Sequence, residues 1–167
     1  MRQQPTRSLL LAVLCCIAFP SAATAADPRD GELKSMCRQI NSLRVQNGVA
    51  PLLISTTLRT AAGWMSTDMA RKNYFSHTDS RGRGLSSRLL AFGYVHPYVA
   101  ENIAAGSSSA SATMELWKNS PAHRANMLNP SFTVIGIGRS YDSASASAYG
   151  YYWTTKFGNV ATSAIVC

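Results

Sequence analysis

The sequence predicts an α+β domain in which helices precede most of the strands. Residues 30–47 and 55–72 carry apolar residues at the three- and four-residue spacing of helices. Two β-rich runs, residues 133–140 and 149–158, come near the end of the chain. Strands and helices do not alternate as they do in parallel βαβ folds. These observations favour one layered domain without internal repeats.

The first two helices are predicted from their apolar stripes and their end signals. The first ends at Gly48, a residue that easily adopts the left-handed conformation at a helix C-terminus. The second starts after Ser55, a plausible N-cap, and runs to about Lys72. The stripes consist of Leu33, Cys37, Ile40 and Leu43 in the first helix, and of Leu58, Ala61, Ala62, Met65 and Met69 in the second.

Shorter elements follow. Residues 73–84 are predicted to be a loop because of their Gly, Ser, Asn and Asp content, and residues 85–92 a short helix that stops at Gly93. Residues 94–103 are predicted to be extended, with an interruption at Pro97. A helix around residues 110–117 leads to Ser120 and Pro121, which mark the start of another helix. The Ser- and Ala-rich stretch 141–148 is predicted to be a mobile connection between the last two strands.

The N-terminal segment is predicted to be a signal peptide, residues 1–25. Arg2 and Arg7 precede an apolar run, and Ala23 and Ala25 provide the small residues of a cleavage site. The run is too short for a stable membrane anchor, and no second long apolar segment appears. We therefore expect residues 26–167 to form a single exported domain without a transmembrane anchor, secreted or periplasmic.

Two of the four cysteines lie outside the predicted signal peptide, Cys37 and Cys167. In an oxidising compartment an even pair favours a disulfide over a metal site or a catalytic thiol. We therefore expect this pair to tie the C-terminal part of the domain to its first helix.

The chain is basic, with a formal net charge of +8. Its basic residues are scattered singly and match no nucleic-acid motif, so we expect no nucleic-acid partner. A positive surface favours solubility and also attracts anionic envelope polymers or lipid headgroups. The oligomeric state is left open.

Three polar residues stand out as candidates for chemistry: His77, Glu101 and His123. Glu101 lies among apolar residues and needs charged or hydrogen-bonding partners, which the two imidazoles can supply. His123 falls in the first turn of a helix, whose dipole disfavours its protonation. It can serve as a metal ligand, a general base or a packed polar residue. Ser120 is either the cap of this helix or, as the lesser alternative, a nucleophile, and His96 is predicted to be an exposed turn residue.

Four separated motifs together resemble the CAP superfamily, in its bacterial SCP-like branch. They are the stretch from residue 51 to residue 82 with its "FSH" loop, "AENIAAG", "LWKNSPAHRANMLNPSFTVIGIG" and "YYWTTKFG". The resemblance implies an α-β-α sandwich with a central antiparallel sheet between helical layers. It also implies an open cavity lined by two histidines and two glutamates, of which His77, Glu101 and His123 match three.

The chain departs from the family pattern at two positions. Ala100 replaces the glycine that usually precedes the glutamate, so this backbone does not need glycine. Ser120 stands where the family has its other glutamate, and Glu115 is expected to point to a different face of its helix. The cavity set is therefore expected to be a triad, with Glu115 and Ser120 as secondary candidates for a fourth member.

We expect a protein that acts by binding rather than by turnover. Its ligand would be a lipid or sterol, an envelope component, or a divalent metal such as zinc held by His77 and His123. The alternatives are a peptidase-like hydrolase that uses Glu101 or a metal-bound water, and a non-catalytic structural or interaction module. Fold resemblance alone does not separate them.

Overall fold

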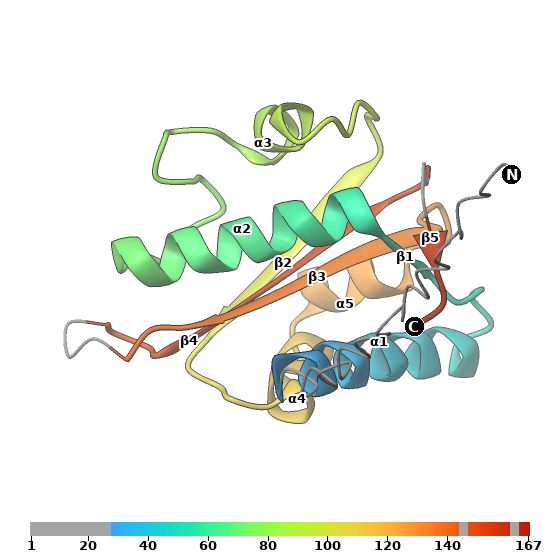
Figure 1. Cartoon of the computed structure of the whole chain (residues 1–167). Helices are drawn as coiled ribbons and strands as arrows, with labels where there is room; N and C mark the ends of the chain where they lie inside the picture. Colours follow the sequence, from blue (N-terminus) through green and yellow to red (C-terminus); the bar gives the residue numbers. More distant parts are fainter. Residues whose placement is uncertain (1–27, 144–146, 161–163) are drawn as a thin grey trace, which may run out of the picture.

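The computed structural model describes residues 28–143, 147–160 and 164–167 (Figure 1). The predicted signal peptide and residues 144–146 of the predicted mobile connection lie outside the described residues. The helices are α1 (Pro28–Gln46), α2 (Thr56–Lys72), α3 (Leu85–Ala91), α4 (Ala110–Lys118) and α5 (Pro121–Leu128). The strands are β1 (Leu53–Ser55), β2 (Val99–Ala105), β3 (Val134–Tyr141), β4 (Tyr151–Gly158) and β5 (Ala164–Ile165). All predicted helices are confirmed, whereas the extended segment expected from residue 94 begins as a strand only at Val99.

The five described strands form one sheet in the order β2-β4-β3-β1-β5. The pairs β2–β4, β3–β4 and β1–β5 are antiparallel, but β1 runs parallel to β3, with Leu53 opposite Val134. The expected antiparallel pairing is confirmed for the three long strands, and the parallel contact of β1 makes the whole sheet mixed. Strands β1 and β5 were not predicted, because they are too short to show an alternating pattern.

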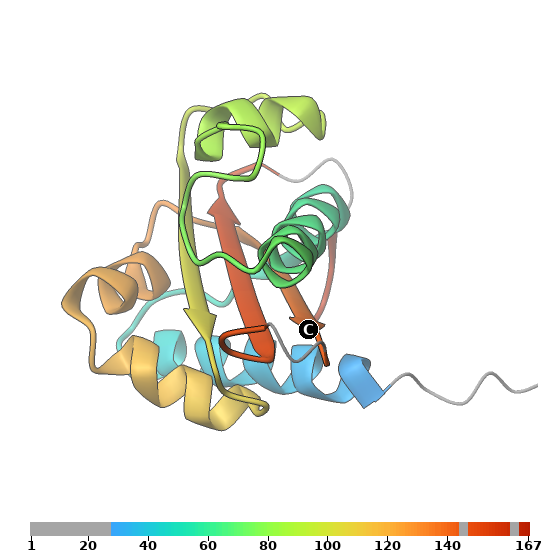
Figure 2. The same cartoon turned by 90° about the vertical axis from the view of Figure 1, so that its left-hand side faces the viewer.

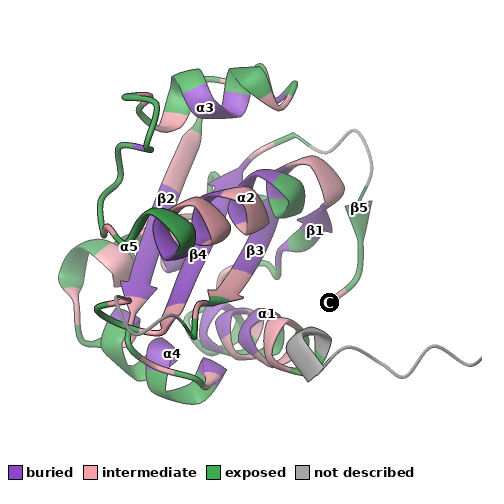
Figure 3. Cartoon of the chain, turned by 60° about the vertical axis from the view of Figure 1, so that its left-hand side comes forward, coloured by how far each residue is buried: buried purple, intermediate pink, exposed green. Residues whose placement is uncertain are grey.

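The sheet lies between two helical layers. Helices α1, α4 and α5 cover one face and α2 and α3 the other, so the architecture is an α-β-α sandwich (Figures 1 and 2). The three long strands are buried over most of their length because both faces are covered (Figure 3). Among the described residues, no helix has the length and hydropathy needed to cross a membrane.

The core is divided between the two sides of the sheet. Under α1 and α4, Met36, Ile40 and Trp117 pack with Trp153 and Phe157 of β4. Smaller clusters lie under α2 and α3, where Met65, Met69, Ile103 and Tyr152 form one group, and Leu58, Ala61, Leu89, Tyr94 and Val134 form the other.

Helix starts are set by serine at three places, but not in the same way. Ser55 and Ser109 accept hydrogen bonds through their Oγ atoms from the amides of Leu58 and Ala112. Ser120 occupies the N-cap position of α5, yet its side chain makes no capping hydrogen bond. The predicted capping role of its hydroxyl is therefore wrong, and Pro121 at the first helical position is the signal that is confirmed.

Helix α2 packs directly on β3 because two positions of that strand have no side chain. A Cβ atom on Gly136 would lie 2.0 Å from the carbonyl carbon of Leu58, and one on Gly138 would lie 2.3 Å from that of Ala62. Such distances are far below van der Waals contact. Glycine at both positions therefore sets how closely the helix and the sheet approach.

We expect Gly136→Ala to lower the free energy of unfolding by about 1–3 kcal/mol or more, because the helix backbone must move away from the sheet. Gly63→Ala is the matched control, since this α2 glycine has nothing within 4 Å of the added carbon. That change should raise the free energy of unfolding by up to about 1 kcal/mol. Urea denaturation of both variants tests the close approach, and equal effects would contradict it.

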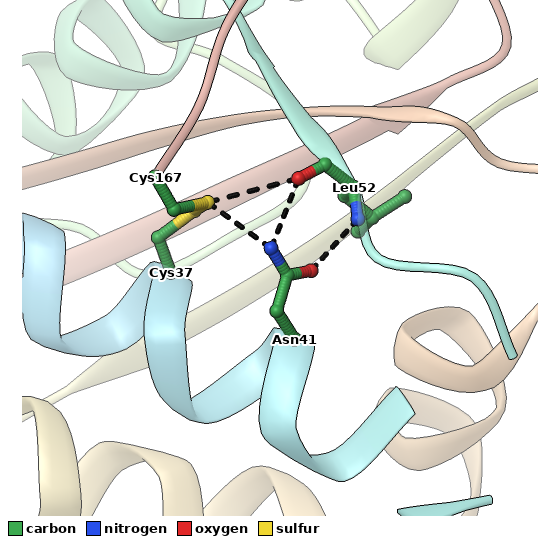
Figure 4. The surroundings of a disulfide bond; sticks show 4 residues. All are labelled: Cys37, Asn41, Leu52 and Cys167. Atoms are coloured by element: carbon green, nitrogen blue, oxygen red, sulfur yellow. Dashed lines mark hydrogen bonds between the residues drawn. A yellow bond between two sulfur atoms is a disulfide. The ribbon is translucent and has the colours of Figure 1, made fainter. Parts of the chain in front are cut away.

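The predicted disulfide between Cys37 and Cys167 is present, with Cα atoms 5.8 Å apart. Asn41, one turn after Cys37, joins α1 to the segment before β1 (Figure 4). Its side chain donates to the carbonyl of Leu52 at 2.9 Å and accepts from the amide of Leu52 at 2.8 Å. The C-terminal segment, α1 and the start of β1 are thus fixed together at one end of the molecule.

Candidate functional site

Glu101 is brought to its main partner by strand register. It lies on β2 directly opposite Lys156 on β4, and directly opposite residues of antiparallel strands point to the same face. The Lys156 ammonium forms an ion pair with Oε2 of Glu101. Both side chains are almost completely buried, with 0% of Lys156 and 2% of Glu101 exposed.

Two further residues complete the Glu101 cluster, which consists of His77, Arg88, Glu101 and Lys156. Arg88 of α3 donates through Nη2 to Oε2 of Glu101 at 2.6 Å, and through Nη1 to the carbonyl of His77 at 3.1 Å. Nδ1 of His77 lies 2.9 Å from Oε1 of Glu101. Because an ionised carboxylate only accepts hydrogen bonds, Nδ1 carries the proton of this bond.

The charges of the cluster hold Glu101 in its ionised form. Burial alone would raise the pKa of Glu101, but the hydrogen bond from His77 and the charges of Lys156 and Arg88 outweigh it and hold this pKa at about 2. Burial lowers the pKa of Lys156 to about 8, against the attraction of Glu101. At neutral pH the carboxylate is therefore an anion that two buried cations already neutralise.

His123 is positioned by the packing of α5 against β2. The side chain of Asn102 donates to the carbonyl of His123 at 3.0 Å, and the side chain of Asn126 donates to Oδ1 of Asn102 at 2.8 Å. At the other end of α5, the buried Arg44 guanidinium donates to the carbonyls of Met127 and Asn129 at 2.8 and 3.0 Å. Helix α5 is therefore held at both ends, which fixes the place of the imidazole.

The His123 side chain is half-buried beside an apolar pocket. Burial, together with electrostatic repulsion from His77, lowers the pKa of His123 below its ordinary value of 6.5. Its ring lies 6.3 Å from the ring of Trp117, measured between centroids. The neutral imidazole donates one hydrogen bond through one ring nitrogen and accepts one through the other.

The pocket beside His123 has a volume of about 300 Å³ and extends past β2, an edge strand of the sheet. We call it the His123 pocket. Ile103, Ala104 and Ala105 of β2, with Phe75, Leu116, Trp117, Ser120, His123 and Tyr149, form its wall. Seven of these nine residues are apolar or aromatic. The indole of Trp117 already donates to the carbonyl of Ile103, so Ser120, His123 and the hydroxyl of Tyr149 are the hydrogen-bonding groups left to a ligand.

The structure separates the two secondary candidates for a fourth cavity residue. Ser120 lines the His123 pocket. Glu115 is exposed and forms an ion pair with Lys118 at 2.7 Å on the surface of α4, so it points away from the pocket as expected. His96 is half-buried, and its ring packs edge-on against that of Tyr94 with centroids 5.0 Å apart.

The expected partnership of Glu101 with both histidines is found for one of them. His77 binds the carboxylate, whereas the other two partners among the described residues are Arg88 and Lys156. The sequence does contain a signal for these cations. Each is the one charged residue of an otherwise uncharged run, "SSRLLAFG" and "YYWTTKFG", and is opposite in sign to Glu101.

The donor set of His77, Glu101 and His123 does not fit zinc, one of the ligands expected from the sequence. Both oxygens of Glu101 already accept bonds from His77, Arg88 or Lys156, and two buried cations beside the carboxylate repel a third. The remaining ligands are two imidazoles, fewer than the three protein ligands of catalytic zinc sites. Within the described ranges, no group of three His, Cys, Asp or Glu side chains is placed to share an ion.

Comparisons with known proteins agree with this architecture. A family model described as CAP, the cysteine-rich secretory protein family, matches residues 37–157. The protein YkwD of Bacillus subtilis (strain 168) is 35% identical over 138 residues, which make up 83% of this chain and 49% of YkwD. The chain therefore spans about half the length of that relative.

Solved structures give the same result. The crystal structure of an extracellular protein containing a SCP domain, from Bacillus anthracis, superimposes with a TM-score of 0.68 at 30% identity, over 77% of this chain and 40% of that protein. An outer surface protein from Borrelia burgdorferi superimposes with a TM-score of 0.71 at 20% identity, over 79% of this chain and 95% of that one, which shows a shared fold.

Proposed function

The chain belongs to the CAP family of cysteine-rich secretory proteins, and from this premise we propose that it is an exported protein that acts by binding a lipid or sterol in the His123 pocket. The export is supported by the disulfide between Cys37 and Cys167, which persists in oxidising compartments. The Bacillus anthracis protein, 30% identical to this chain, is an extracellular protein, which points the same way.

One observation carries the choice of binding over turnover: the buried carboxylate of the Glu101 cluster is already bound by three partners among the described residues. A general base must accept a proton near the working pH. Glu101, with a pKa of about 2 and three partners among the described residues, is a weak base held in place by its neighbours. Its role is then to fix His77, α3 and β4 around the edge of β2. This argues against Glu101 as the general base of the hydrolase alternative, which then rests on a metal-bound water.

The wall of the pocket indicates the chemistry of the ligand. Phe75, Leu116 and Tyr149 are 45%, 55% and 48% exposed, so the mouth of the pocket offers apolar surface to solvent. Burial of such surface by a ligand is favourable in proportion to the area covered. Ser120 and the neutral His123 can bind one hydroxyl or carboxyl group of that ligand. This combination suits an apolar molecule with a single polar end.

The proposal is tested by binding of a fluorescent sterol and a fluorescent fatty acid to the exported protein. Leu116→Glu places a charge at the pocket mouth and should weaken binding of the preferred probe by about tenfold or more, because the charge must be desolvated. Leu90→Glu is the matched control, since Leu90 is 59% exposed on α3 and does not line the pocket. This variant should bind within about twofold of the wild type.

Two results would overturn the proposal. Equal loss in both variants, or no binding of either probe, would remove the pocket as a lipid site. Zinc binding measured by calorimetry that is lost in His77→Ala and His123→Ala but kept in His96→Ala would instead support the metal alternative.

A further inference from the structure

A second surface of the molecule has the features of an anion site. A groove of about 660 Å³ runs between the C-terminal half of α2 and the loop that follows it. Trp64, Thr67, Asp68, Arg71, Lys72 and Arg81 line it, and we call it the Trp64 groove. It shares no residue with the His123 pocket.

The cations of the groove are available to a ligand. Arg71, Lys72 and Arg81 are exposed, and none of them forms an ion pair with a carboxylate in the described part of the chain. Unlike them, Arg83 and Lys118 are paired with Asp79 and Glu115. Lys72 attracts Asp68 without forming an ion pair with it, so among the described residues none of the three cations of the groove is neutralised by a direct ion pair.

Asp68 is the single acid among the lining residues, and it is engaged within the protein. Oδ2 accepts from the hydroxyl of Tyr74 at 2.5 Å and from the amide of Ser80 at 2.9 Å, and Oδ1 accepts from the hydroxyl of Ser80 at 2.7 Å. These bonds tie the loop to α2. The groove thus has three exposed positive charges and one negative charge, and the negative charge is already hydrogen-bonded within the protein.

Trp64 adds a flat aromatic surface to this charge. The guanidinium carbons of Arg81 and Arg83 lie 5.8 and 5.1 Å from the centroid of its ring, and Phe92 packs on it at 5.9 Å. The indole is thus held in position by cation–π and aromatic contacts. The Trp64 ring can stack on a sugar or polyol, while the neighbouring guanidinium groups bind two oxygens of a phosphate group.

We propose that the Trp64 groove binds a phosphate-bearing saccharide or polyol polymer of the cell envelope. Several cations along an open groove match a ligand with repeated charge better than a single small anion. Arginine binds phosphate through two parallel hydrogen bonds, and the indole supplies the contact with the carbon skeleton. The proposal shares with the proposed function only the export of the protein, because the ligand and the site are different.

The test measures binding of poly(glycerol phosphate) to the exported protein at low and at physiological salt. The variant Arg71→Gln/Lys72→Gln/Arg81→Gln should bind about tenfold or more weakly at low salt and show a smaller salt dependence. The control Lys34→Gln/Arg38→Gln/Arg59→Gln removes the same charge from exposed residues outside the groove. It should stay within about threefold of the wild type, since long-range attraction is screened.

A third variant separates the stacking contact from the charge. Trp64→Leu should weaken binding of poly(glycerol phosphate) while binding of inorganic polyphosphate, which has no carbon skeleton, is kept, and thermal unfolding checks that the variant is folded. Equal losses in the two triple variants would mean nonspecific attraction and would overturn the proposal. Binding to vesicles of anionic phospholipid but not to the polymer would overturn it as well. These outcomes do not depend on whether a sterol or fatty acid binds in the His123 pocket, because the two sites share no residue.

Discussion

Glu101→Gln is expected to lower the free energy of unfolding by about 3–5 kcal/mol at pH 7, because it leaves two buried cations without their anion. Arg88 and Lys156 are both 0% exposed and both bind Oε2 of Glu101. The amide has nearly the same size as the carboxylate, so the change removes charge and creates no cavity. Urea denaturation followed by circular dichroism provides the measurement.

Glu115→Gln is the matched control for this prediction. It removes the same charge from a surface ion pair with Lys118, in which the Glu115 side chain is 61% exposed. Exposed pairs of this kind contribute little, so the change should stay within about 0.5 kcal/mol. Similar losses in the two variants would show that the buried cations find other partners once the carboxylate is gone.

Acid unfolding gives an independent readout of the same cluster. The pKa of Glu101 is lowered from 4.5 to about 2 in the folded protein. Its contribution to stability is therefore fully present above about pH 4.5 and is lost as the pH falls towards 2, a loss of about 3 kcal/mol. The difference in stability between the wild type and Glu101→Gln should shrink over this range. A constant difference would contradict the lowered pKa.

Loss of the disulfide should have an effect of similar size. The double variant Cys37→Ser/Cys167→Ser is expected to unfold with a free energy lower by roughly 2–5 kcal/mol, the larger figure being the chain-entropy value for a loop closed over 130 residues. The bridge also holds β5, whose two residues are exposed and pair with Ile54 and Ser55 of β1. Faster hydrogen exchange at these β1 residues should accompany the loss.

A reducing agent provides the control for the disulfide. It should destabilise the wild type to the level of the double variant and leave the double variant unchanged. Intact-mass analysis after alkylation should find the two thiols blocked before reduction and reactive afterwards. Free thiols in the exported protein, or equal stability of the variant and the wild type, would contradict the prediction.

The sequence predicts the helices and the long strands of this domain because each has a signal of its own. The apolar stripe of α2 and its Ser55 cap fix that helix within a residue at each end. Strands β1 and β5 have no such signal, since three and two residues are too few for a pattern. Both exist through pairing with distant segments, and the parallel contact between β1 and β3 follows from tertiary packing alone.

The sequence predicts three residues of the candidate site, but it does not predict most of the ion pairs and hydrogen bonds between the site residues. His77, Glu101 and His123 fall on the loop, strand and helix that surround the edge of β2. The partners of Glu101 depend on cross-strand register and on the placement of α3, which local sequence does not encode. The burial of Arg44 and its role in holding α5 are not predicted from the sequence for the same reason. Its four hydrogen bonds go to carbonyls of residues 50, 127, 129 and 132, three of them far along the chain.

The place of β1 between β3 and β5 determines when the molecule can be assembled. Within the described residues, Leu53–Ser55 pair only with residues 134–135 and 164–165. A chain that leaves an export channel with its N-terminus first cannot complete this part of the sheet until β3 and β5 have also emerged. Folds dominated by such distant pairings form slowly, over milliseconds to seconds. During that interval the apolar faces of α1 and α2 are uncovered, and an incomplete chain of this fold is prone to aggregate until its last strand is available.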